Sequence, residues 1–247
     1  MIDFVSPDIR YSVADYKKQA IASIEEILKK GKIPIIVGGT GLYVDSLIYG
    51  IEYQNIEFDS EYRKKLENIA QEEGLDKLYE EASKIDPEAI KSISKNDKKR
   101  IIRILEIYKA TGKTKTEQEI ESRKKEIPYD YKVFAINMER EILYDRINRR
   151  VDIMVQQGLI EEVKNICKKY KTYPTAMQAL GYKEIKEYLE GKTTKEEAIE
   201  KIKQETRRYA KRQLTWFRKN KQTIWLNGTA DRQNNINIIL EGMNWKK

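Results

Sequence analysis

The sequence predicts an α/β fold, in which a core built around a parallel sheet is interrupted by an all-helical insertion. A segment of helical period after Ser12 leads directly into a short apolar run, Ile33–Val37. Helices that alternate with strands are typical of parallel sheets covered by helices. Two further apolar runs follow, at 132–138 and 223–227. The residues between 52 and 131 instead form charged segments of helical period without a strand pattern.

The first helix is predicted from its two ends. Ser12 and Asp15 have the spacing of a capping box, and an apolar face continues from there until Gly31 ends the helix. The predicted strand Ile33–Val37 comes next, and Met1–Pro7 is compatible with the end of another strand.

The insertion is divided by residues that end helices. Its charged segments, 60–74, 76–85 and 95–112, are separated by Gly74, Pro87 and Gly112. We therefore expect the α/β core to comprise 1–51 and 132–247, and the helical insertion to comprise 52–131. The tail after Asn227 is expected to form a loop and a short closing helix.

The amino-acid composition argues against a membrane-spanning or secreted protein. Of the 247 residues, 40% are hydrophobic and 36% are charged. No apolar run approaches the ~20 residues that a membrane-spanning helix needs. The first residues also lack the basic and then apolar pattern of a secretory signal. A cytoplasmic protein without a membrane segment is the expectation.

The chain contains no histidine, which excludes imidazole catalysis and histidine-containing metal sites. Because no imidazole is present to activate it, Cys167 is predicted to be a buried structural thiol and not a nucleophile. The net charge of +8 and the isoelectric point near 9.2 favour a polyanionic partner.

A glycine-rich turn follows the first predicted strand. Gly38 and Gly39 allow the backbone to turn sharply and to approach a ligand closely, and Thr40 offers a hydroxyl where α/β proteins usually bind ligands. A tight strand-to-helix turn without a ligand explains the same residues equally well.

The stretch "ATGKT" at 110–114 ends like a phosphate-binding loop. That motif requires a glycine where this sequence has Ile107, and it follows a strand, whereas this stretch follows a helix. Gly112 is therefore predicted to end a helix.

Basic residues gather in three groups at helical spacings. Each group alone is better explained as a solvated helix face, but three of them in a chain of positive net charge favour phosphate binding. The groups are Lys98, Lys99, Arg100 and Arg103; Arg146, Arg149 and Arg150; and Arg207, Arg208, Lys211 and Arg212, with aromatic residues interleaved in the last.

Five ordered stretches carry a resemblance to a known family. They are "IPIIVGGTGLYVDSLIYGI", "NDKKRIIRILEIYKATGKT", "RINRRVDIMVQQGLIEEV", "TAMQALGYKEIKEYLEG" and "RRYAKRQLTWFR". In this order they resemble the bacterial tRNA dimethylallyltransferases, also called tRNA isopentenyltransferases, and the resemblance runs from Ile2 to about Asn227.

The resemblance implies a prenyltransferase that moves a dimethylallyl group from dimethylallyl diphosphate to N6 of the adenosine 3′-adjacent to the anticodon, with Mg²⁺ assisting. It implies a core similar to the nucleotide-binding phosphate-loop NTPases, which bind ATP or related ligands. It also implies that the helical insertion grips the anticodon stem-loop of tRNA. A monomer is expected.

The resemblance also implies roles for individual residues. Arg150 matches an arginine that holds the diphosphate of the donor, and Thr40 matches a threonine that contacts tRNA; these two are the expected catalytic residues. Gly38 and Gly39 match a turn beside the substrate channel. The expected RNA-binding residues are Lys99, Arg100, Arg103, Gln178, Gly181, Tyr182 and Lys183, of which Lys99 stands where the family usually has glutamine.

The sequence departs from the family pattern at its beginning. It has neither the phosphate loop ending in Gly-Lys-Ser/Thr nor the following Asp-Ser segment that holds the expected general base and the usual Mg²⁺ ligands. We therefore expect an N-terminally truncated core with impaired activity, and we assign no metal ligand. A non-catalytic RNA-binding module is the alternative, and a small-molecule kinase is a weaker one because no Walker-type loop is present.

Overall fold

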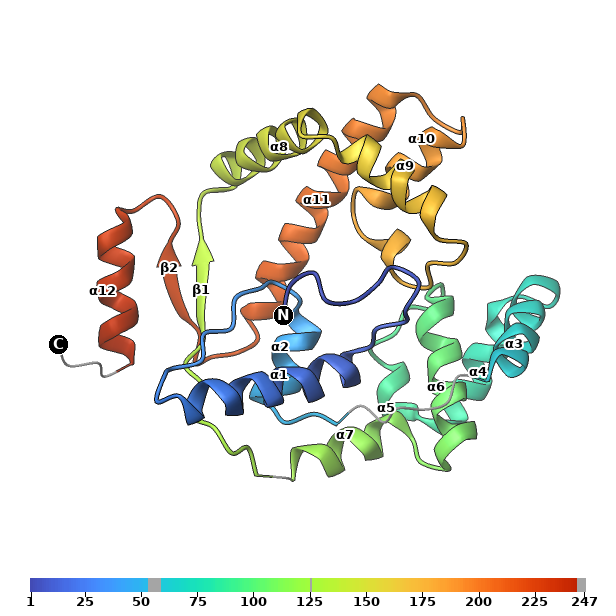
Figure 1. The fold of residues 1–247 in the computed structure, drawn as a ribbon. Helices are drawn as coiled ribbons and strands as arrows, with labels where there is room; N and C mark the ends of the chain where they lie inside the picture. Colours follow the sequence, from blue (N-terminus) through green and yellow to red (C-terminus); the bar gives the residue numbers. More distant parts are fainter. Residues whose placement is uncertain (53–58, 125, 244–247) are drawn as a thin grey trace. The chain divides into compact units, whose positions relative to one another are not determined.

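A computed structural model of the chain describes residues 1–52, 59–124 and 126–243. They form two compact units, of which the first comprises Met1–Gly41 with Asp130–Lys247 and the second comprises Leu42–Tyr129 (Figure 1). The first boundary between the units lies after Gly41, earlier than the expected boundary after residue 51. The second lies after Tyr129, close to the expected boundary after residue 131. Residues 53–58 and 125 of the expected insertion, and 244–247 of the tail, lie outside the described residues.

The first unit combines helices with a small parallel sheet. Strand β1 pairs with strand β2 in parallel, in a register that joins Phe134 to Ile224 and Asn137 to Asn227. This confirms the two strands predicted from the later apolar runs and the parallel arrangement. The elements of this unit are α1 (Val13–Lys29), β1 (Phe134–Asn137), α8 (Arg140–Gln156), α9 (Leu159–Lys169), η1 (Ala176–Gln178), α10 (Tyr182–Leu189), α11 (Lys195–Phe217), β2 (Ile224–Asn227) and α12 (Arg232–Gly242).

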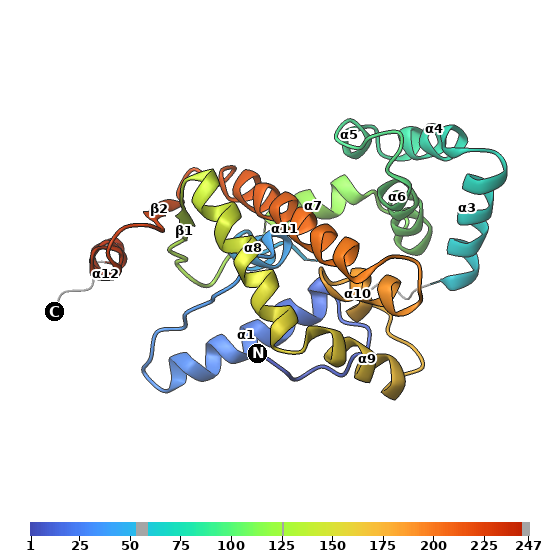
Figure 2. The same ribbon diagram turned by 90° about the horizontal axis from the view of Figure 1, so that it is seen from above.

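The core of the first unit lies among α8, α9, α10 and α11. Its buried side chains include Val163 and Ile185, which are fully enclosed, and the partly buried Cys167 packs against the same cluster. Figures 1 and 2 show α8 beside α11, and the two helices are in contact. Helix α12 packs against β2, which confirms the predicted closing helix.

The prediction of a strand at Ile33–Val37 is wrong. These residues have no regular secondary structure, and the side chains of Ile35 and Val37 are 79% and 90% exposed. A strand is held by the hydrogen bonds that it makes to a neighbour, and no neighbouring strand pairs with this segment among the described residues. Met1–Pro7 likewise forms no strand.

The second unit contains helices and, among its described residues, no strand. The core lies between α3, α4 and α6, where Leu78, Ile101 and Leu105 are almost completely buried. The helices are α2 (Gly41–Ile48), which begins at the last residue of the first unit, α3 (Ser60–Glu72), α4 (Leu75–Ile85), α5 (Pro87–Ile90), α6 (Lys98–Thr111) and α7 (Lys115–Arg123).

The helix ends follow the local sequence. Ser12 and Asp15 form a reciprocal capping box at the start of α1, as predicted. Gly112 ends α6 with φ at 67°, in the left-handed region that favours glycine, which confirms that "ATGKT" ends a helix. In the same unit Asp86 is 1% exposed and accepts hydrogen bonds from the N–H of Ala89 and from both the N–H and the hydroxyl of Thr116, so it ties α5 to α7.

Within the described ranges, no helix is both long and apolar enough to cross a membrane.

Candidate functional site

The glycine-rich turn is held against the long helix α11. The carbonyl oxygen of Gly39 accepts a hydrogen bond of 2.8 Å from Nε2 of Gln213 and one of 3.4 Å from the hydroxyl of Tyr209. Two residues later, Gly41 lies so close to Trp216 that an added Cβ would stand 2.5–2.6 Å from three atoms of the ring. The turn is therefore fixed at two points on one helix.

Close contact with α11 explains why two of the three positions in the turn are glycine. A Cβ on Gly39 would collide with the amide of Gln213, and a Cβ on Gly41 would collide with the ring of Trp216, whereas a Cβ on Gly38 would meet nothing within 4 Å. Thr40 stands between the two fixed points and is exposed, and its hydroxyl makes no hydrogen bond to any described residue. Its hydroxyl is thus presented to solvent by a turn that cannot easily move.

Helix α11 also supports α8. Arg207 donates a hydrogen bond of 2.6 Å to Oδ1 of Asn148, and its guanidinium lies 5.9 Å from the ring centre of Tyr144. One turn earlier on α11, Lys203 pairs with Asp152 at 2.8 Å, and the Lys203 side chain is only 14% exposed. A partly buried ion pair and a charge-assisted hydrogen bond thus fix the register of the two helices.

The three arginines of the basic group on α8 differ in their partners. Arg149 pairs with Asp145 at 2.7 Å, and Arg146 donates to the carbonyl oxygen of Gly228 at 3.3 Å. Arg150 is exposed and makes neither a hydrogen bond nor an ion pair with any residue in the described ranges. At about 100° per residue it lies about 200° around α8 from Asn148, which faces α11. Of the three, Arg150 is the guanidinium available to an anion.

A second group of basic residues opens α6 in the other unit. Lys99, Arg100 and Arg103 are all exposed, while the opposite side of the helix is buried. Arg100 lies 3.3 Å from Asp97, the residue that caps the helix, and Arg103 lies 3.5 Å from Glu106. Lys99 makes no hydrogen bond or ion pair with the described residues. The positive end of the helix dipole adds to their charge.

Glu106 is the buried partner in that group, with a side chain that is 8% exposed. One of its oxygens faces Arg103 and the other lies 3.3 Å from Arg63 on α3. A buried carboxylate needs such partners because its desolvation is otherwise costly. The position of Arg103 is therefore coupled to the packing of α3 on α6.

The segment from Gln178 to Lys183 comprises the end of η1, the turn at Gly181 and the first residues of α10. Gly181 has φ at 96°, where a side chain would be strained, and its N–H donates to Glu184 at 2.9 Å. The hydroxyl of Tyr182 donates to Glu162; burial and this bond raise the pKa of Tyr182 to about 12. Gln178 donates to the carbonyl of Pro174, and Lys183 lies 3.9 Å from Glu187. The exposed amide and ammonium groups border this turn.

The structure thus distributes the predicted residues over two units. Thr40 with its glycines, Arg150, and the turn before α10 belong to the first unit, where α11 contacts the glycine turn, α8 and α10. Lys99, Arg100 and Arg103 belong to the second unit.

Sequence reasoning did not identify Tyr209, Gln213 or Trp216. The aromatic and amide residues interleaved with the basic run were the available signal, but the run was interpreted as a phosphate-binding face.

The described residues offer no ready-made site for the expected Mg²⁺. Divalent magnesium prefers carboxylate and carbonyl oxygens, and the described ranges bring no three acidic, histidine or cysteine side chains together in a way that could hold a metal ion. We therefore assign the ion no ligands in this chain and derive no step through it.

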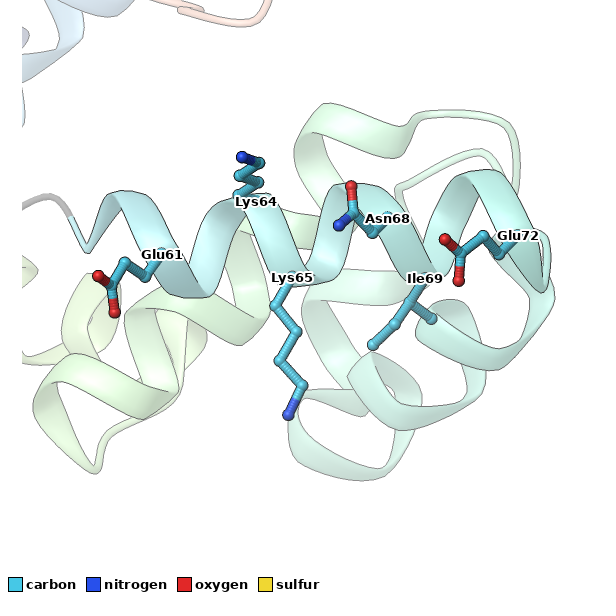
Figure 3. Close-up of a pocket in the computed structure, with 6 residues that line it drawn as sticks. All are labelled: Glu61, Lys64, Lys65, Asn68, Ile69 and Glu72. Atoms are coloured by element: carbon cyan, nitrogen blue, oxygen red, sulfur yellow. The ribbon is translucent and has the colours of Figure 1, made fainter.

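A shallow depression of about 410 Å³ runs along α3 (Figure 3). Every residue that lines it belongs to that one helix, and Figure 3 shows Lys64 and Lys65 pointing to opposite sides. Its polar groups do not converge on a common point, as those of a ligand site do. The lining residues are Glu61, Lys64, Lys65, Asn68, Ile69 and Glu72.

The chain matches known proteins over most of its length. Residues 1–220 match the family model described as IPP transferase. A protein of Acetivibrio thermocellus named tRNA dimethylallyltransferase is 48% identical over 228 residues, which cover 92% of this chain and 73% of that protein. A relative of the same name from Caldanaerobacter subterraneus subsp. tengcongensis is 49% identical over 221 residues, covering 88% and 70% of the two chains.

Solved structures agree with the sequence matches. A tRNA isopentenylpyrophosphate transferase from Bacillus halodurans is 41% identical, with a TM-score of 0.67, and the match covers 98% of this chain and 77% of that one. A eukaryotic dimethylallyltransferase acting on tRNA is 28% identical, with a TM-score of 0.70, over 99% and 65% of the two chains. These matches show that the chain belongs to the IPP transferase family, the prenyltransferase enzymes named tRNA dimethylallyltransferases.

Proposed function

We propose that the chain transfers a dimethylallyl group from dimethylallyl diphosphate to N6 of the adenosine 3′-adjacent to the anticodon of a tRNA. One observation carries the assignment of its site. Helix α11 supports both the turn that presents Thr40 and the helix that carries the unpaired Arg150. A single rigid element thus positions the residue proposed to meet the tRNA and the residue proposed to meet the donor.

The reaction requires stabilisation of a leaving diphosphate anion. The N6 amine forms a bond to C1 of the dimethylallyl group, the bond from C1 to the diphosphate oxygen breaks, that electron pair leaves with the diphosphate, and the amine gives up its proton to water. Charge therefore develops on the diphosphate oxygens. A guanidinium that is exposed and unpaired, as Arg150 is, suits this role because it offers several N–H donors in one plane.

The proposed acceptor is the anticodon stem-loop. Net charge of +8 and exposed Lys99, Arg100 and Arg103 at the start of α6 favour contact with a phosphate backbone. The turn from Gln178 to Lys183 offers an amide and an ammonium group on a rigid support. Removing the adenine from its stack costs a few kcal/mol, and enzymes that modify bases must offset this cost with such contacts. The cytoplasmic location, the monomeric state and Mg²⁺ dependence remain predictions.

Changing Arg150 to alanine tests the proposal. We expect a single-turnover transfer rate lower by about 100-fold, typical of removing one donor from a charge-stabilising site, with the affinity for the stem-loop within about twofold. Arg140→Ala is the matched control, since Arg140 is an exposed arginine on the same helix that bonds only to Tyr144 among the described residues.

Two results would contradict this assignment. Equal loss of rate and of affinity in Arg150→Ala would place Arg150 in RNA binding and not in donor binding. A parent chain that binds the stem-loop but transfers nothing would favour the alternative of a non-catalytic RNA-binding module.

A further inference from the structure

We propose that Gln213 is a positioning residue for the transfer reaction: its side-chain amide holds the carbonyl of Gly39 and thereby fixes the turn that presents Thr40. The inference rests on the proposed function, because Thr40 matters only if this turn borders the reaction channel. We assign Gln213 no contact with the reacting groups themselves.

The first support is that the turn has few other anchors. From Ile33 to Gly39, no backbone group makes a hydrogen bond to another backbone group of the described residues. The preceding side chains of Ile35 and Val37 point into solvent and contribute little packing. The bonds from Gln213 at 2.8 Å and from Tyr209 at 3.4 Å are therefore the polar links that hold Gly39, and the shorter bond has the better geometry.

The second support is the geometry of α11. Tyr209, Gln213 and Trp216 are spaced by four and three residues, so they share one face of the helix. Lys203 and Arg207, which hold α8, point in other directions: at about 100° per residue they lie roughly 80° and 120° around the helix from Gln213, and roughly 120° and 160° from Tyr209. A change of Gln213 should therefore loosen the turn and leave the contacts to α8 intact.

The third support is the fit between glycine and amide. The carbonyl can meet Gln213 only because position 39 has no Cβ, and position 41 accepts the ring of Trp216 for the same reason. Two glycines that each make room for one side chain of the same helix indicate that the turn and α11 are matched to each other. Proximity of this kind supports rate by holding reacting groups in register.

The experiment replaces Gln213 with methionine, which keeps the length of the side chain and removes its donor. Gln204→Met is the matched control, because Gln204 is an exposed glutamine on the same helix. Three quantities are measured for each variant and the parent: the single-turnover transfer rate, the affinity for an anticodon stem-loop, and hydrogen–deuterium exchange in the peptide covering 41–48, which is helix α2 and begins at the turn.

We expect Gln213→Met to exchange faster in that peptide alone and to transfer about 10- to 100-fold more slowly, since small misplacements cost rates of this order. Its affinity for RNA should stay within about twofold of the parent, and Gln204→Met should match the parent throughout. A general loss of folding would instead raise exchange across the unit, including α8.

Unchanged exchange at 41–48 in Gln213→Met would overturn the inference, and so would faster exchange with an unchanged transfer rate. A parent without transfer activity would refute the proposed function instead, and exchange alone would then decide whether Gln213 holds the turn.

Discussion

Replacing Gly41 with alanine tests how tightly the glycine turn is held. The added Cβ would lie 2.5–2.6 Å from three ring atoms of Trp216, whereas carbon atoms in good contact are about 3.5–4.0 Å apart. Overpacking of this kind costs about 1–3 kcal/mol. Alanine also favours the helical conformation over glycine by up to about 1 kcal/mol, and this gain offsets part of the cost because Gly41 is the first residue of α2. We therefore expect a net loss of about 1–2 kcal/mol.

The assay is thermal unfolding followed by calorimetry. For a chain of this size a loss of about 1–2 kcal/mol lowers the melting temperature by roughly 2–8 °C. Gly38→Ala is the control, because its Cβ would meet nothing within 4 Å and Gly38 is not among the glycines with positive φ. That control should melt at or slightly above the temperature of the parent. The contact between Gly41 and Trp216 would be refuted if the two variants melted at the same temperature.

Two further predictions concern the second unit. Asp86→Asn should destabilise the link between α5 and α7 by about 1–3 kcal/mol, since one N–H of Thr116 would face an amide donor. Burial opposes ionisation of Asp86, but its bonds to Thr116 and Ala89 outweigh burial and hold its pKa below the ordinary 3.8. Its contribution is thus complete above about pH 4 and declines as the pH falls through the lowered value, so the melting temperatures of parent and variant should converge in acid; a constant difference would contradict this. Arg103→Ala should weaken binding of the stem-loop and reduce the slope of its affinity against salt concentration by about one unit. Lys91→Ala is the control, because it removes an exposed lysine of the same unit that is paired with Glu88, and it should leave the slope unchanged. Equal slopes in both variants would mean that Arg103 only faces solvent and does not contact RNA.

The features predicted correctly from the sequence are those set by residues that are close together in the chain. The capping box of α1 joins residues only three positions apart, and Gly112 ends α6 through its own backbone conformation. The two later strands were predicted from their apolar runs, and they form because each finds the other as a partner. The run Ile33–Val37 is also apolar, but it has no paired neighbour among the described residues. Composition marks a segment that could form a strand, whereas pairing decides whether it does.

The site was predicted in part for the same reason. Glycines at a turn and clusters of arginine are visible in the sequence, but the resemblance to the family is what singled out Thr40 and Arg150 among them. The bond from Gln213 to Gly39 joins residues 174 positions apart, so no local pattern could indicate it. The sequence also could not show that Arg149 is paired with Asp145 while Arg150 is not, because three adjacent arginines at helical spacing are equivalent until their neighbours in space are known.

The most direct test of the central claim is the mass of an anticodon stem-loop after incubation with this chain, dimethylallyl diphosphate and Mg²⁺. We expect a mass gain of one dimethylallyl group when the position 3′-adjacent to the anticodon is adenosine. No gain is expected when that position is guanosine, which lacks the N6 amine. No gain with adenosine, while a full-length relative is active in parallel, would contradict the claim that this chain performs the transfer.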